Sequence, residues 1–146
     1  MPAVGDVKLN PGRADYPEEG YRSRFNHATE KAVPGYYEVM LDDYGIKAQL
    51  TATQRTGIHK YTFPKGEDGH LILDLVHGIY NYDGKVLWAN LRVENDTLLT
   101  GYRITNGWAR TNYTYFAISL SQPIKDYGYK AVSYTHLRAH ETKANL

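Results

Sequence analysis

The chain has 146 residues and no cysteine, so it offers one ordinary domain without disulfides or thiolate zinc sites. Its formal net charge is +1, which excludes the basic excess that neutralises a nucleic-acid backbone. No apolar run approaches the roughly 18 residues that span a bilayer, and residues 1–12 lack the pattern of a secretory signal. We therefore expect no nucleic-acid partner, no membrane span and no export signal within this chain.

The first 35 residues predict mostly irregular structure. Turn-forming Asn, Pro and Gly recur at residues 10–12, 16–20 and 33–35. Within this stretch, only Val7–Leu9 predicts a short strand.

A β-hairpin is predicted next. Apolar and polar residues alternate over residues 37–42 and again over 46–53, on either side of a short turn that contains Gly45. Such alternation around a tight turn is typical of two paired strands with one buried face. The side chains expected to share one face of a third strand are His59, Tyr61 and Phe63.

The second half of the chain predicts four more strands. Residues 70–76 form a nearly continuous apolar run, which is typical of a central strand. The other three strands are expected to present one face each, lined by Leu87, Ala89, Leu91 and Val93, by Leu98, Thr100, Tyr102 and Ile104, and by Thr114, Phe116, Ile118 and Leu120. Short strands with turns every eight to twelve residues indicate an all-β, antiparallel β-sandwich.

The last residues do not follow this pattern. Residues 133–146 (SYTHLRAHETKANL) show neither strand alternation nor an amphipathic stripe, and they resemble an adapter-derived peptide found at the ends of translated metagenomic assemblies. The alternative is a short native terminal helix or frayed end. We therefore expect a partial sandwich domain over residues 1–132, followed by a non-native or disordered tail.

No catalytic pair or metal site can be assigned from residue types and spacing. A glycosidase needs two carboxyl groups that flank the scissile bond, but most acidic residues here lie in predicted turns. Asp42 and Asp43 alone are a weak calcium signal. His59 and His77 are candidates for acid–base chemistry, although structural roles on a strand face or strand end are more common for such residues.

Both tryptophans are candidates for sugar contact. Trp108 follows a predicted turn and precedes Arg110 by two residues, so its ring could stack on a pyranose beside a hydrogen-bond donor. Trp88 lies opposite the predicted apolar face of its strand, where it would cover the outer side of the sheet or a domain interface. Packing is the alternative role for each of them.

The segment Tyr21–Pro64 closely resembles the N-terminal domain of glycoside hydrolase family 92, the exo-acting α-mannosidases. It contains the strings SRFNH, EKAVPGYY and GIKAQLTATQRTGIHKYTFP in the order and spacing of the family. Asn26 stands where the family usually has Ser. The resemblance extends over roughly residues 1–130.

The resemblance implies more than the residues alone show. Members of the family join a galactose-mutarotase-like β-sandwich to a C-terminal (α/α)6 barrel, and they hydrolyse terminal α-mannosides of glycans with inversion and with Ca²⁺. Their catalytic residues and calcium ligands come chiefly from the barrel. The resemblance therefore implies that this chain is an incomplete sandwich, inactive alone, from a bacterial enzyme that works in the periplasm or outside the cell.

Three residues of the resembling segment are candidates for substrate binding or a domain interface. Arg24, His27 and Glu30 would line the rim of a pocket, or they would form a local network that fixes an irregular loop. Two other functions stay open. A free-standing carbohydrate-binding module would use Trp108, and an aldose epimerase-like sandwich would use His59 or His77 as acid and base.

Overall fold

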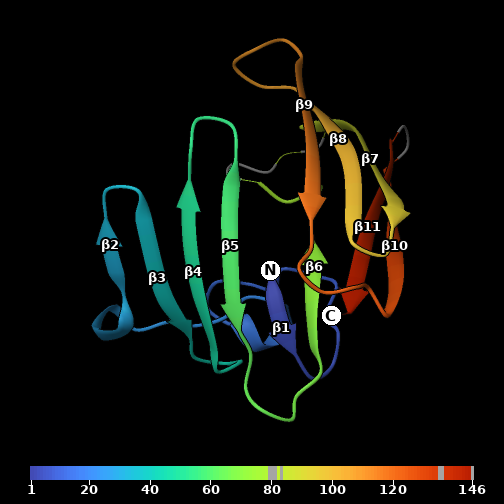
Figure 1. The fold of residues 1–146 in the computed structure, drawn as a ribbon. Coiled ribbons are helices and arrows are strands. Elements are labelled where there is room, and N and C mark those ends of the chain that lie inside the picture. Colours follow the sequence, from blue (N-terminus) through green and yellow to red (C-terminus); the bar gives the residue numbers. More distant parts are fainter. Residues whose placement is uncertain (79–81, 83, 135–136, 146) are drawn as a thin grey trace. The chain divides into compact units, whose positions relative to one another are not determined.

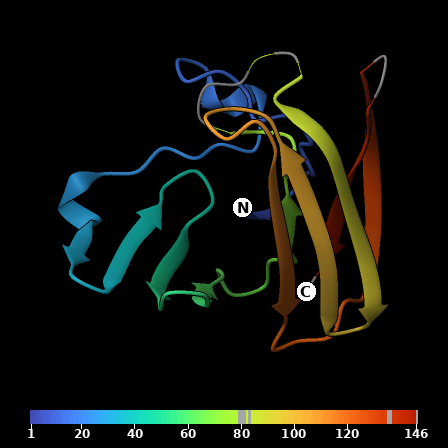
Figure 2. The same cartoon turned by 90° about the horizontal axis from the view of Figure 1, so that it is seen from above.

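The computed structural model describes residues 1–78, 82, 84–134 and 137–145, and these residues form antiparallel strands joined by turns (Figures 1 and 2). Two short 3-10 helices interrupt the strands, η1 (Pro17–Glu19) and η2 (His27–Thr29). The chain divides into two compact units, Met1–Gly69 and His70–Leu146. The all-β character predicted from the sequence is confirmed.

The first unit contains one four-stranded antiparallel sheet. Its strands lie in the order β2-β3-β4-β5, so each is hydrogen-bonded to its neighbour along the chain. This simple meander requires only short turns between strands. The bounds are β2 (Lys31–Val33), β3 (Tyr36–Leu41), β4 (Ile46–Ala52) and β5 (Gly57–Thr62), preceded in the chain by a short strand β1 (Pro2–Val4).

The predicted hairpin is β3 and β4. Val39 pairs with Ala48 and lies on the same face as Ile46, and the exposed fractions of these three residues are 6%, 5% and 0%. Gly45 closes the turn with a φ of +61°, a conformation that costs glycine little. The alternation in the sequence thus identified the buried face correctly.

The opening stretch differs from the sequence prediction. Val7–Leu9 is not a strand, and the short strands of this region are β1 and β2 instead. Two turns fold against each other here, because the amide of Tyr21 donates to the carbonyl of Asn10 at 2.9 Å. Alternation over three residues was too short a pattern to place a strand.

The second unit contains two groups of paired strands. β7 (Val86–Asn95), β8 (Leu98–Thr105) and β9 (Asn112–Ser119) form an antiparallel sheet in chain order. In the other group, β11 (Leu137–Asn145) pairs with both β6 (Gly69–Leu73) and β10 (Asp126–Tyr134). Leu75, Val86 and Ala89 form a buried cluster against which Phe116 packs.

Three details of the second unit correct the sequence prediction. Strand β6 ends at Leu73 rather than at residue 76, because the Asp74 carboxylate accepts the amides of the two residues that follow Leu75 and bends the chain. A register shift between Val86 and Trp88 reverses the phase of β7, so Val86 is buried whereas Leu87 is 36% exposed.

The third correction concerns β8. Leu99 is 1% exposed, and it lies on the same face as Gly101, opposite Ile118 of β9. The face predicted to line the strand, with Leu98, Thr100, Tyr102 and Ile104, is therefore the opposite one. Because Leu98 and Leu99 are adjacent, the alternation does not show which of them lies on the buried face. The residues around them led to the wrong choice.

The tail forms strand in the structure. The backbone of β11 pairs with β10 from Asp126 opposite Asn145 to Tyr134 opposite Leu137. The expectation that residues 133–146 are not part of the natural protein concerns their origin, and it stays a prediction. Residues 135, 136 and 146 of this segment lie outside the described residues.

Candidate functional site

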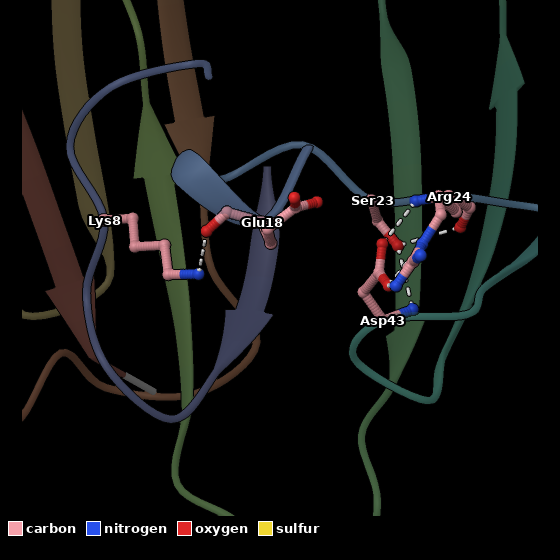
Figure 3. Close-up of polar contacts among 5 residues, drawn as sticks. All are labelled: Lys8, Glu18, Ser23, Arg24 and Asp43. Carbon is pink, nitrogen blue, oxygen red and sulfur yellow. Dashed lines mark hydrogen bonds and ion pairs between the residues drawn. The ribbon is translucent and has the colours of Figure 1, made fainter. Parts of the chain in front are cut away.

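The loop before η2 is tied to the β3–β4 turn by Arg24 and Asp43 (Figure 3). The Arg24 Nε donates to Asp43 Oδ1 at 2.8 Å, and the backbone amide of Arg24 donates to Asp43 Oδ2 at 2.6 Å. In return, the amide of Asp43 donates to Ser23 Oγ at 3.2 Å, and the amide of Asp42 donates to the Arg24 carbonyl at 2.9 Å. Together with a second contact from the Arg24 guanidinium to Asp43 Oδ1, these hydrogen bonds fasten an irregular loop to a regular hairpin.

This ion pair fixes the charge of both partners. Hydrogen bonds from the Arg24 side chain hold the pKa of Asp43 below its ordinary value, and the same contact raises the pKa of Arg24. An ionised carboxylate with this many donors has little capacity to exchange a proton near neutral pH. The arrangement suits a structural clamp, which is the local-network role considered for Arg24 from the sequence.

His27 and Glu30 meet at the two ends of η2. The Glu30 Oε2 lies 2.5 Å from His27 Nδ1, and the Tyr37 hydroxyl donates to Glu30 Oε1 at 2.7 Å. Asn26 begins this short helix, because its Oδ1 accepts the amide of Ala28 at 2.8 Å. One carboxylate thus joins an exposed imidazole to a strand tyrosine.

The chemistry of this trio follows from its exposure and charge. The His27 side chain is 84% exposed, whereas the Glu30 side chain is 25% exposed. Hydrogen bonds from His27, and then from Tyr37, lower the pKa of Glu30, and the carboxylate raises the pKa of Tyr37 in turn. The trio presents an oriented imidazole that can hydrogen-bond to a polar ligand such as a sugar hydroxyl.

A second histidine lies on the same sheet face as Tyr37. Tyr37 is opposite Leu50 in the strand register, and Leu50 is opposite His59, so all three point to one side. The His59 Nδ1 lies 2.7 Å from the hydroxyl of Tyr61. The prediction that His59 and Tyr61 share one face of a strand is confirmed, but Phe63 lies beyond the end of β5 at Thr62, and His59 is exposed rather than part of the core.

Sequence reasoning missed the partners that complete these contacts. Asp43 and Tyr37 are the acceptor and donor that bind Arg24 and Glu30, and each lies in a regular hairpin whose pattern indicated only strand and turn. It also missed Glu38, whose pKa is lowered to about 2, chiefly by the ammonium of Lys47. No spacing rule links residues seven to nineteen positions apart across a loop.

The two tryptophans lie in the second unit. Trp88 on β7 is 41% exposed, and it lies on the side of the strand opposite the buried cluster, as predicted. Trp108 lies in the loop between β8 and β9, and its side chain is fully exposed. His77, the other acid–base candidate, has its backbone amide bound to Asp74 Oδ1 at 2.7 Å.

The described residues contain no group of three or more His, Cys, Asp or Glu side chains arranged to hold a metal ion. Asp43, half of the acidic turn considered from the sequence, is bound by Arg24 instead. Likewise, no helix among the described residues is long and apolar enough to cross a membrane.

Comparison with known proteins identifies relatives over nearly the whole chain. Residues 1–145 match the Glycosyl hydrolase family 92 N-terminal domain. The family GH92 α-mannosidase BT3965 from Bacteroides thetaiotaomicron has 30% sequence identity and a TM-score of 0.85, covering 99% of this chain and 21% of its own. The complex of BT3965 with mannoimidazole gives the same identity and TM-score, with 20% of its own chain covered.

These matches bear on the fold class and on the share of the related enzymes that this chain spans. They confirm the antiparallel β-sandwich class that was predicted from the sequence. The chain spans about a fifth of the length of the solved structures it resembles. Among curated protein sequences, none matches it significantly.

Proposed function

The chain belongs to glycosyl hydrolase family 92, whose N-terminal domain it matches, and we propose that it is the scaffold and pocket-wall domain of an exo-α-mannosidase. The observation that carries this proposal is the likeness to an α-mannosidase over 99% of the chain at a TM-score of 0.85. The substrate we propose is a glycan with terminal α-mannose.

In this proposal, catalysis resides in another part of the parent enzyme. A C-terminal (α/α)6 barrel supplies the general acid, the general base and the calcium ligands, and the reaction inverts the anomeric centre. An inverting enzyme needs two carboxyl groups about 6.5–9.5 Å apart, with room for a water molecule between them. We further propose that the parent enzyme is bacterial and acts in the periplasm or outside the cell.

The carboxyl groups of this chain favour a non-catalytic role. A general acid in a glycosidase needs a raised pKa, so that it is protonated at working pH. The carboxyls of Glu30, Glu38 and Asp43 accept hydrogen bonds, chiefly from His27, Lys47 and Arg24 respectively, and these lower the pKa of each. Their partners hold them ionised and in place, which suits a wall that orients a sugar.

The residues with the best geometry for such a wall are His27, Glu30 and Tyr37. The imidazole is exposed, and its orientation is fixed by a carboxylate that also holds a strand tyrosine. Arg24 belongs to a separate clamp and contributes to the wall by holding the loop on which His27 lies.

The test is kinetic and uses the full-length parent enzyme. We expect His27→Ala to raise KM for aryl α-mannosides about tenfold with less effect on kcat, because a wall contact acts in both ground and transition states. Lys60→Ala is the matched control, since Lys60 is an exposed charged side chain of β5 on the sheet face opposite Tyr37. Unchanged KM in a stably folded His27→Ala enzyme would show that the trio is structural only.

A further inference from the structure

One face of the β7–β8–β9 sheet carries a row of exposed aromatic side chains. Tyr113 and Tyr115 on β9 are 59% and 73% exposed, and Trp88 on β7 is 41% exposed. The strand register places Tyr115 opposite Tyr102, and it places Tyr113 and Trp88 on either side of Ile104. Residues opposite each other in a sheet point to the same side, so these aromatic groups form one surface, which we name the aromatic face.

Contacts within the aromatic face keep its rings close together. The ring centroids of Tyr102 and Tyr115 are 5.8 Å apart at an interplanar angle of 44°. Tyr113 and Tyr115 are two residues apart on one strand, which separates them by about 7 Å along β9. The face therefore offers aromatic rings both along β9 and across to β8.

The composition of this face differs from that of the buried face of the same sheet. The buried face carries Ala89, Leu91, Leu99, Phe116 and Ile118. The aromatic face instead alternates tyrosine and tryptophan with Asn90 and Thr100. Tyrosine and tryptophan combine an apolar ring with a polar group that stays hydrated. This composition therefore favours contact with a hydrated, polar ligand over packing in a core.

The charge of the face is balanced. Arg92 Nε lies 3.3 Å from Glu94 Oε2, and Glu94 Oε1 accepts the hydroxyl of Thr100 at 2.6 Å. Arg92 and Glu94, which lie beside the rings, therefore neutralise each other. A charged polymer gains nothing from such a surface, whereas an uncharged ligand with many hydroxyls matches it.

We propose that the aromatic face binds an uncharged glycan chain, with sugar rings stacked on Tyr113 and Tyr115. Asn90 and Thr100 lie on the same face and supply hydrogen bonds to sugar hydroxyls. An exposed aromatic patch rimmed by polar groups commonly marks an interaction site. This glycan contact holds polymeric substrate on the domain and does not depend on the mannosidase activity.

Calorimetry with the 146-residue chain tests the proposal, using soluble yeast mannan and β-glucan as neutral probes and polygalacturonate as a charged one. We expect measurable binding of at least one neutral polysaccharide and none of polygalacturonate. Tyr115→Ala should weaken that binding about tenfold, and Tyr115→Phe should leave it within about threefold, because the ring makes the contact. Tyr127→Ala removes an exposed tyrosine outside this face (54% exposed, against 73% for Tyr115) and should change nothing.

Three outcomes would overturn the proposal. The first is the absence of binding to any neutral polysaccharide by a chain that circular dichroism shows to be folded. The second is equal loss of binding in Tyr127→Ala, since that would mean non-specific adsorption. The third is a dimer, detected by sedimentation without sugar, that Tyr115→Ala dissolves. If Tyr115→Ala fails to fold, Tyr113→Ala takes its place. The proposed mannosidase function is tested separately, by hydrolysis of an aryl α-mannoside by the parent enzyme.

Discussion

The two units of this chain are stabilised by different means. In Met1–Gly69, long-range polar contacts fasten irregular loops to a hairpin, as in the pairs of Arg24 with Asp43 and of Tyr37 with Glu30. In His70–Leu146, an apolar cluster around Val86 and Ala89 lies on one side of a sheet, and exposed aromatic rings lie on the other. The segment that resembles the family motif falls within the first unit, so much of that motif encodes loop architecture.

The largest expected effect is on the small core of the first unit. Ile46 is fully buried, so Ile46→Ala would leave a cavity and lower the free energy of unfolding by about 2–5 kcal/mol. Ile58→Ala is the control, because Ile58 is 62% exposed and should change stability by less than about 0.5 kcal/mol. Urea unfolding checks both. Equal losses of unfolding free energy in the two variants would mean that polar contacts, and not this core, stabilise the unit.

The second unit should be most sensitive where two strands approach closely. A Cβ on Gly101 would lie 2.4 Å from the carbonyl oxygen of Asn90 and 2.6 Å from Phe116 Cζ. We expect Gly101→Ala to cost about 1–3 kcal/mol, because the buried face must move to admit it. Gly107→Ala meets nothing within 4 Å and serves as the control. Thermal unfolding with no difference between the two variants would contradict this packing.

The smallest effect is a dependence of stability on pH that belongs to the first unit. The pKa of Glu38 is lowered from 4.5 to about 2, mainly by hydrogen bonding to Lys47. A lowered folded-state pKa means that this stabilisation is present above pH 4.5 and is lost as pH falls toward about 2. Glu38→Gln should therefore lose stability at neutral pH and show a flatter profile below pH 4.5. Parallel profiles for the two proteins would refute this coupling.

The sequence predicted the fold better than its details. The long alternation in β3 and β4 identified a hairpin and its buried face, because both strands are regular and a glycine closes the turn. The same reasoning misplaced Leu87 and the face of β8, since a bulge and a Leu98-Leu99 pair both shift the phase of an alternating pattern. Periodicity detects regular strands but not the irregularities that redirect them.

The candidate site was predicted only in part. His27 and Glu30 do contact each other, but Arg24 belongs to a different contact, and its partner Asp43 follows nineteen residues later. Such pairings depend on how a loop folds back onto a hairpin, which residue types and spacing do not reveal. The sequence did indicate that Trp88 lies opposite an apolar face and Trp108 in a turn, and both side chains are exposed.

The central proposal is that this chain forms a non-catalytic wall of an α-mannosidase. The most direct test is to measure release of aryl alcohol from an aryl α-mannoside by the purified chain with Ca²⁺, beside the full-length parent enzyme. We predict turnover by the parent and no release above a buffer control by the chain, because the proposed general acid and general base lie in the barrel. Sustained turnover by the chain alone would contradict this account.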